Sequence, residues 1–470
     1  MEEMNRSQEK KQAEELTYQK KSYYDGASEE TMDAIFKYAS GYAAFLDKAK
    51  TEREAVVEGI KMAEKAGYTP YIFGEKLEAG ARRYYNNRGK NLFLIRKGTA
   101  PLEKDGIRIM AAHIDSPRID LKQNPLYEDS QMAFFKTHYY GGLRKYQWLA
   151  IPLAIHGTVV LQNGEAVNIC IGEEDADPVF YINDLLPHLA REQSTKPMAT
   201  AVSGESLNIL IGGIPCKDED VSDRIKYHVL EYLFEKYHIK EVDFQSAELC
   251  VVPAFKARDV GFDRAFIGAY GHDDRVCAYP AMTAMFENAD EAHTILTILA
   301  DKEETGSDGN TGMQCRLLLD IIEDLARLDG VSGAAVRAAS KCLSADVNAA
   351  YDPNYAEVFE KRNAAMISCG AVMSKFTGSG GKSSTNDASA EFVGEIRRMF
   401  AEDSIVWQTA ELGKVDIGGG GTVAKYIANL NIDTVDMGVP VISMHAPYEV
   451  ISKADLYALY RAFAAFCRLD

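Results

Sequence analysis

The chain has 470 residues, of which 46% are hydrophobic and 26% charged, a composition typical of a globular protein with a large core. Its formal net charge of -18 argues against nucleic acid and anionic membranes as partners, because both repel an acidic surface. The apolar stretch over residues 148–161 is too short to cross a bilayer. We therefore expect neither a nucleic-acid partner nor a membrane partner.

The eight cysteines are scattered, and no two have the C-x-x-C spacing of thiolate zinc sites or redox motifs. The N-terminal segment MEEMNRSQEKKQAEEL is charged and lacks the apolar core of a signal peptide. Scattered thiols without a disulfide framework are typical of proteins in a reducing compartment. The sequence therefore predicts a cytoplasmic location.

Residues 1–27 are expected to form a charged arm, and residues 28–65 have a helical pattern. Within that pattern, Thr51 and Glu54 have the spacing of a helix-capping box. Strand-like and helix-like runs then alternate along the chain. The strand-like runs include residues 91–95, 107–112, 294–299 and 439–444, and the helix-like runs include residues 275–288, 311–328 and 453–468.

This alternation predicts an α/β fold with a largely parallel mixed sheet flanked by helices. Residues 124–245 have a different pattern from the rest of the chain, because alternating β-type runs such as HGTVVLQNG and AVNICIG dominate there. We interpret residues 124–245 as an inserted β-rich domain. The flanking segments, residues 1–123 and 246–470, would then form one domain from two stretches of chain.

Histidines and carboxylates recur directly after the strand-like runs, where open α/β sheets place their functional sites. Two divalent ions about 3.5–4 Å apart can activate a water and stabilise an oxyanion, and they bind such side chains. Each signal is weak alone, since a lone histidine is usually structural and paired aspartates often cap a helix. Five segments of one chemical kind together favour a two-metal hydrolase. The residues concerned are His113 and Asp115, Asp273 and Asp274, Glu303 and Glu304, Asp346, and His445.

The segments HIDSPRIDLK, GHDDRVCAYPAM, DKEETGS, SADVNAAYDPNY and MHAPYE occur in this order along the chain. With them, nearly the whole chain resembles the aspartyl aminopeptidase and vacuolar aminopeptidase I family of dizinc exopeptidases. The resemblance implies a zinc exopeptidase-like catalytic domain with an inserted dimerisation domain. It also implies an enzyme that removes the first residue of short peptides with a free N-terminus, using two Zn²⁺ for which Co²⁺ or Mn²⁺ can substitute. Assembly into homododecamers built from dimers is implied as well.

The resemblance also assigns roles to the clustered residues. The implied metal ligands are His113, Asp273, Glu304, Asp346 and His445. Asp273 would bridge the two ions, although the family often has Asn where this chain has Asp274, which leaves the choice between the two aspartates open. Glu303 would be the general base, and Asp115 would orient the His113 ring.

Three further residues are substrate-binding candidates. His188 lies in LLPHLAREQ, near the place where relatives contribute a histidine to a neighbouring subunit's site, but the usual position here holds Glu192. Lys375 and Lys382 are candidates for pairing with an acidic substrate side chain, and ordinary surface lysines are the alternative. A preference for acidic or for neutral first residues therefore stays open.

Two other functions stay open beside the aminopeptidase. One is a different dizinc amidohydrolase on the same fold, such as a carboxypeptidase or a deacylase. The other is a catalytically inactive assembly protein, which the complete set of implied ligands argues against. The glycine-rich run FTGSGGKSS does not complete a phosphate-binding loop, because Phe376 stands where that motif needs glycine.

Overall fold

The computed structural model describes residues 8, 10–13, 15–287 and 292–469, and its strands form three sheets. The largest sheet has nine strands in the order β1-β2-β3-β14-β4-β15-β19-β17-β18. Its strands are β1 (Thr69–Pro70), β2 (Arg82–Asn87), β3 (Asn91–Arg96), β4 (Ile107–His113), β14 (Thr294–Ala300), β15 (Lys341–Ser344), β17 (Ala371–Ser374), β18 (Trp407–Thr409) and β19 (Asp433–Gly438).

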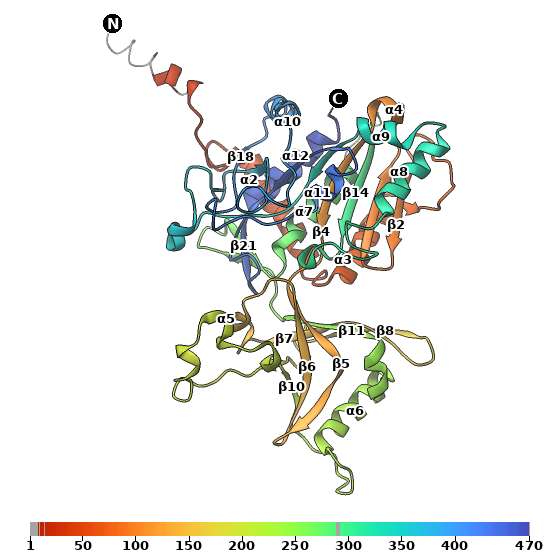
Figure 1. Ribbon diagram of the computed structural model, residues 1–470, viewed down its shortest axis with the longest axis vertical. Coiled ribbons are helices and arrows are strands. Elements are labelled where there is room, and N and C mark those ends of the chain that lie inside the picture. Colours follow the sequence, from red (N-terminus) through yellow and green to blue (C-terminus); the bar gives the residue numbers. More distant parts are fainter. Residues whose placement is uncertain (1–7, 9, 14, 288–291, 470) are drawn as a thin grey trace.

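Helices cover both faces of the nine-stranded sheet (Figure 1). Along β4, Met110 and Ala112 join the core on one face, and Ile109 and Ala111 join the core on the other, because successive strand residues point to opposite faces. The helices over the first face are α2 (Glu29–Leu46), α3 (Glu52–Lys65), α7 (His272–Glu287), α10 (Ala390–Glu402) and α12 (Lys453–Phe466). Those over the second are α4 (Leu102–Asp105), α8 (Leu317–Leu328), α9 (Gly333–Ala339) and α11 (Ala424–Ala428).

The nine-stranded sheet is mixed. Its central strands β14, β4, β15 and β19 are all parallel to one another, whereas the pairs β2–β3, β3–β14 and β17–β19 are antiparallel. The carboxyl ends of the four central strands therefore lie at one edge of the sheet. Each loop that leaves this edge can present side chains to a common site.

A small five-stranded sheet supplies further loops beside that edge. Its strand order is β12-β13-β21-β20-β16. The strands are β12 (Arg258–Val260), β13 (Phe266–Ala269), β16 (Asn348–Ala349), β20 (Pro440–Ile442) and β21 (Glu449–Ser452).

The seven-stranded sheet projects away from these two sheets, at the bottom of the view in Figure 1. All its neighbouring strands are antiparallel, in the order β8-β7-β11-β5-β6-β10-β9. Its elements are β5 (Arg118–Asp129), β6 (Met132–Tyr140), β7 (Leu153–Val160), β8 (Ala166–Ile171), β9 (Tyr181–Ile182), β10 (Ile209–Gly212) and β11 (Ala247–Pro253), with α5 (Met198–Ala201) and α6 (Arg224–Tyr237) beside them.

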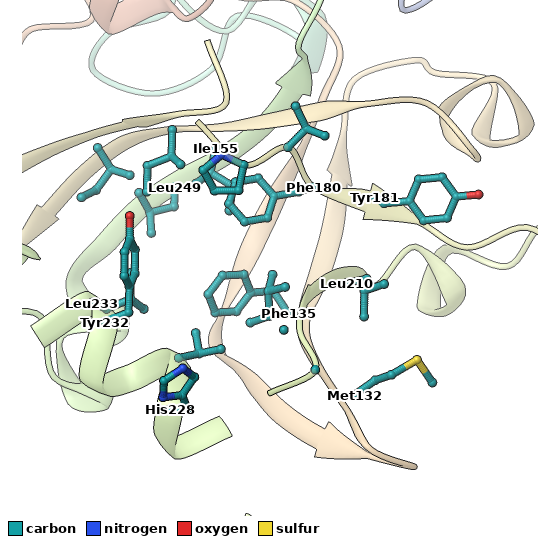
Figure 2. Close-up of a pocket in the computed structure, with 18 of the residues that line it drawn as sticks. Met132, Phe135, Ile155, Phe180, Tyr181, Leu210, His228, Tyr232, Leu233 and Leu249 are labelled. Atoms are coloured by element: carbon teal, nitrogen blue, oxygen red, sulfur yellow. The ribbon is translucent and has the colours of Figure 1, made fainter. Parts of the chain in front are cut away.

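An apolar cavity of about 580 Å³ lies between the seven-stranded sheet and helix α6. Figure 2 shows Phe135, Leu233 and Leu249 around it, with Tyr181 at one side. Among the described residues, none of the helices combines the length and the apolarity needed to cross a bilayer.

Most predicted strands are confirmed. Residues 91–95, 107–112 and 294–299 lie in β3, β4 and β14. The strand predicted at residues 439–444 is wrong in extent, because only Pro440–Ile442 is extended and it belongs to the five-stranded sheet. The chain leaves the nine-stranded sheet at the end of β19, and Pro440, which has no backbone N–H, starts a separate short strand.

The helical pattern over residues 28–65 is confirmed as two helices, α2 and α3. Thr51 and Glu54 make the predicted capping box at the start of α3. The arm predicted for residues 1–27 falls partly on residues 1–7, 9 and 14, which lie outside the described residues.

The helix predicted at residues 311–328 is confirmed as α8, but it starts only at Leu317. The residues before Leu317 contact the end of β14 instead of forming helix. The Thr311 hydroxyl donates a hydrogen bond to the carboxylate of Asp301, and Gly312 forms an isolated β-bridge with Asp301. The two remaining helices are confirmed as α7 and α12, with Asn288 outside the described residues.

Candidate metal centre

The structure brings all five predicted metal ligands to one place, where the nine-stranded and five-stranded sheets meet the seven-stranded sheet. Strands of the nine-stranded and five-stranded sheets end there, and each predicted ligand stands at or beyond the end of one of them. His113 ends β4, Asp273 follows β13, Glu304 follows β14, Asp346 follows β15, and His445 lies between β20 and β21.

Asp273 lies at the middle of this group. Its Oδ1 is 3.1 Å from Nε2 of His113, and its Oδ2 is 3.1 Å from Nε2 of His445. Donor atoms of His113, Asp273 and Asp346 lie within 4.8 Å of one another, as do those of Asp273, Glu304 and His445. Two three-residue groups thus share one carboxylate.

The neighbouring Asp274 is buried as well, but it belongs to neither of these groups. The two carboxylate oxygens of Asp273 face the two histidines, one each. The geometry therefore favours Asp273 over Asp274 as the shared residue.

Both histidine rings are held by their Nδ1 atoms. Nδ1 of His113 lies 3.0 Å from the carbonyl oxygen of Asp115, and Nδ1 of His445 lies 2.8 Å from the carbonyl oxygen of Gly142. An Nδ1–H that donates to a carbonyl leaves the Nε2 lone pair free for a metal. Both rings therefore direct an electron-pair donor toward Asp273.

Asp115 positions more than the His113 ring. Its carboxylate accepts hydrogen bonds from the backbone N–H groups of Glu303 and Glu304, at 3.1 and 3.2 Å, and from the Tyr140 hydroxyl at 2.8 Å. The 3-10 turn that carries both glutamates is thus tied to the end of β4. Asp115 itself is buried behind the centre.

Glu449 was not among the residues singled out in the sequence, although it ends the MHAPYE segment. Its carboxylate accepts hydrogen bonds from the backbone N–H of His445 at 2.7 Å and of Asp273 at 3.1 Å. It is 1% exposed, and burial raises its pKa to about 8. The signal in the sequence is a carboxylate four residues after a candidate ligand, which alone does not predict this contact.

The carboxylates of the centre are crowded and largely desolvated. Burial, followed by the attraction of His113 and the repulsion of Asp273, sets the pKa of Glu303 at about 7, and burial raises the pKa of Glu304 and Asp346 well above the usual range. For His445, burial lowers the pKa, but Asp273 outweighs burial and raises it to about 10. The only basic side chains paired with these carboxylates among the described residues are the two histidines, so carboxyl groups outnumber basic groups in the centre.

Divalent cations would satisfy this arrangement. Oε1 of Glu304 is buried and has no hydrogen-bond partner among the described residues. Imidazole nitrogens and carboxylate oxygens are the ligands that zinc uses in hydrolytic sites. The residues present therefore fit zinc.

His272, directly before Asp273, is held by hydrogen bonds within the fold and is not placed as a metal ligand. Nδ1 of His272 lies 2.9 Å from the Tyr42 hydroxyl, and its Nε2 lies 3.1 Å from the carbonyl oxygen of Ile267. Both ring nitrogens are engaged by the fold, and burial lowers the pKa of His272 to about 3.

The three substrate-binding candidates lie in exposed segments. Lys375 and Lys382 both pair with Asp387, with Nζ to carboxylate oxygen distances of 2.5 and 2.9 Å. His188 is exposed in the segment between β9 and α5, and Glu192 pairs with Lys196 at 3.2 Å. Their roles toward substrate stay predictions.

A helix-flanked mixed sheet whose strand ends gather two histidines and several carboxylates in one buried group defines a metal-dependent hydrolase. The family model of the aminopeptidase I zinc metalloproteases, M18, matches residues 45–467. The chain belongs to this M18 family, and it is a zinc metalloaminopeptidase that hydrolyses peptide bonds.

Relatives agree with this family over nearly the whole length. A probable M18 family aminopeptidase 1 from Clostridium acetobutylicum is 48% identical over 460 residues, which cover 96% of this chain and 99% of the relative. The crystal structure of an M18 family aminopeptidase from Thermotoga maritima has a TM-score of 0.91 at 42% identity, covering 96% of this chain and 99% of that one. The S. cerevisiae mApe1 dodecamer shares the fold, with a TM-score of 0.76 at 21% identity over 93% of this chain and 97% of that one.

Proposed function

We propose that the chain holds two zinc ions, with His113 and Asp346 on one, His445 and Glu304 on the other, and Asp273 shared between them. The observation that carries this proposal is the placement of the two Asp273 oxygens, each 3.1 Å from Nε2 of a different histidine. Co²⁺ or Mn²⁺ would suit the same donors. When bound, such ions lower the pKa of a water and polarise the peptide carbonyl.

Other side chains of this centre would transfer the proton and position the ligands. Glu304 and Asp273 are almost fully buried, whereas the Glu303 side chain is 18% exposed and reaches the open side of the group. With a pKa near 7, Glu303 can accept a proton from the attacking water and return it to the leaving amine. Asp115 holds the backbone of Glu303 in place, and Glu449 does the same for His445.

A pocket of about 680 Å³ adjoins the centre and would admit a short peptide. Tyr140, Gly141 and Thr305 line it, whereas none of the five proposed metal ligands does. A Cβ added at Gly141 would lie only 3.2 Å from Cβ of Glu304, so glycine keeps this wall close to the centre. We assign this space to the peptide beyond the scissile bond. Lys375, Lys382 and His188 remain the candidates for reading the substrate, and the choice between acidic and neutral first residues stays open.

A comparison of free and blocked peptides tests the aminopeptidase against its rival. The enzyme, reconstituted with Zn²⁺ or Co²⁺, is expected to cleave the first bond of a free-amine peptide and to leave its N-acetylated twin intact. Cleavage of the acetylated peptide, or release of the C-terminal residue, would instead identify a deacylase or a carboxypeptidase.

The proposed domains are residues 1–123 and 246–470 for catalysis and residues 124–245 for dimerisation. Exposed apolar side chains in the seven-stranded sheet region support self-association, because Leu189 and Ile214 are 68% and 70% exposed, and Ile214 also lines the apolar cavity. The dodecameric relative leads us to propose a homododecamer built from dimers. Light scattering of the purified protein would measure the mass of the assembly, which should be twelve times that of one chain.

We also propose a cytoplasmic location. None of the eight cysteines, all of which lie within the described residues, forms a disulfide, and five of them are buried. Thiols that remain unpaired are typical of a reducing compartment. Fractionation of the source cells tests this assignment.

A further inference from the structure

A second group of metal-binding side chains lies away from Asp273, where helix α3 meets strands β7 and β8. It consists of Glu54, His156 and Cys170, and we call it the His156 cluster. One donor atom from each residue lies within 4.8 Å of the other two. The position follows from the fold, because His156 and Cys170 are directly paired across β7 and β8, and Glu54 stands in the first turn of α3.

The His156 ring is fixed from both sides. Its Nδ1 lies 2.7 Å from Oε1 of Glu54, and its Nε2 lies 3.0 Å from Oε1 of Glu173. The ring is 2% exposed, whereas Cys170 is exposed. An ion can therefore reach the cluster from solvent while the imidazole stays in one orientation.

Glu173 gives this cluster the outer carboxylate that metal-binding histidines usually have. It is itself held by Lys50 at 2.6 Å and by Lys256 at 3.1 Å. Glu173 can thus keep accepting from Nε2–H while Nδ1 binds a metal. The two lysines stay paired with Glu173 and do not occupy the Glu54 side of the ring.

We propose that Nδ1 of His156, the carboxylate of Glu54 and the thiolate of Cys170 bind a divalent transition-metal ion of the zinc type. The ion replaces two protons, one shared between Nδ1 and Glu54 and one on the Cys170 thiol. Two positive charges leave and two arrive, so the net charge of the cluster, including Lys50 and Lys256, is unchanged.

The donor set selects the class of ion. A thiolate, an imidazole and one carboxylate suit Zn²⁺ or Co²⁺, whereas Mg²⁺ and Ca²⁺ require oxygen ligands. Zinc lies about 2.0–2.3 Å from such donors. The donor atoms lie within 4.8 Å of one another, and Nδ1 of His156 and Oε1 of Glu54, now 2.7 Å apart, would separate to admit the ion. The exposed side of Cys170 leaves the fourth position to water.

Such an ion would join helix α3, which packs on the nine-stranded sheet, to two strands of the seven-stranded sheet. Glu54 comes from α3, while His156 and Cys170 come from β7 and β8. The ion would therefore act as a structural cross-link between helix α3 and the seven-stranded sheet. This role is independent of the zinc ions proposed at Asp273.

Cobalt absorption of the full-length protein tests the site directly. Metal-free protein titrated with Co²⁺ is expected to develop a near-ultraviolet thiolate-to-cobalt charge-transfer band. No ligand proposed for the Asp273 centre is a cysteine, so the band reports sulfur coordination elsewhere, whether or not that centre works as proposed. Cys170→Ser should abolish the band, and the control Cys315→Ser should retain it.

A second variant tests the carboxylate. Glu54→Gln should raise the Co²⁺ concentration at half-maximal band intensity about tenfold or more, because one charged ligand is lost. Retained aminopeptidase activity shows that each variant is folded. A wild-type titration without the band, a band that survives in Cys170→Ser, or an unchanged midpoint in Glu54→Gln would overturn the proposal.

Discussion

The molecule contains two groups of histidines and carboxylates with opposite electrostatic balance. At the Asp273 centre the carboxylates pair with histidines only, and burial raises the pKa of Glu303 to about 7. At the His156 cluster, His156 and Lys50 outweigh burial and lower the pKa of Glu173 to about 2. Similar residue types thus produce crowded carboxyl groups with raised pKa values in one place and balanced ion pairs in the other.

The difference between the two groups indicates when buried carboxylates depend on a bound metal ion. Buried carboxyl groups without nearby lysines or arginines have raised pKa values, and a divalent cation would stabilise their charged form. Where lysines are present, the same carboxylates are already stable, and a metal can enter only by displacing protons. The experiments below separate these two cases, beginning with the change of largest expected effect.

Asp273→Asn should cause the greatest loss. One substitution removes the charge between His113 and His445, so both proposed ions should be lost, and turnover should fall about 10⁴-fold or more. Metal analysis of the purified variant, together with a peptidase assay, measures this. Full metal content with normal turnover would show that Asp273 is not the shared ligand.

Glu303→Gln separates proton transfer from metal binding at the same centre. Turnover should fall by about 10²- to 10⁴-fold, because an amide cannot accept the water proton. Metal content should stay at the wild-type level. If turnover were unchanged, the base would have to be another residue.

Glu449→Gln tests whether the backbone of the centre needs its buried carboxylate. Because Glu449 holds the N–H groups of Asp273 and His445, metal affinity or activity should fall about 10- to 100-fold. A matched control is Asp455→Asn, which removes another buried carboxylate that accepts two backbone N–H groups, from Ser368 and Gly370. The control should lower thermal stability and leave metal affinity intact, whereas equal effects on metal affinity would contradict a specific role for Glu449.

Glu173→Gln tests the balanced cluster, where stability should change and activity should not. Breaking the buried pairs with Lys50 and His156 should cost about 3 kcal/mol in the free energy of unfolding at pH 7. The folded-state pKa of Glu173 lies below its usual value of 4.5, so this stabilisation is fully present above pH 4.5 and is lost as the pH falls toward 2. Unfolding measured at pH 7 and near pH 3.5 should show a smaller difference between variant and wild type at the lower pH.

The smallest effect is expected at the two exposed lysines. Lys375→Ala or Lys382→Ala should reduce turnover of acidic relative to leucyl substrates by about two- to fivefold, since exposed charge pairs contribute little. A panel of aminoacyl chromogenic substrates measures the ratio. A constant ratio in both variants would remove the lysines from substrate selection.

The sequence by itself predicted the mixed α/β fold, three strands of the nine-stranded sheet and the set of residues that meet around Asp273. It could do so because strands β3, β4 and β14 are fully buried segments rich in apolar residues, and because parallel strand ends share one edge of a sheet. Family membership, shown by the comparisons, agrees with the motif order. The individual roles of the clustered residues stay predictions.

Only the tertiary structure decided which groups orient them. The carbonyl of Gly142 lies 303 residues from His445, and Glu449 lies 176 residues from Asp273, so no local pattern pairs them. The His156 cluster has the same origin, because Glu54 and His156 are 102 residues apart. Residue type and strand position are local properties that a sequence carries, whereas hydrogen-bond partners and charge balance depend on which distant segments pack together.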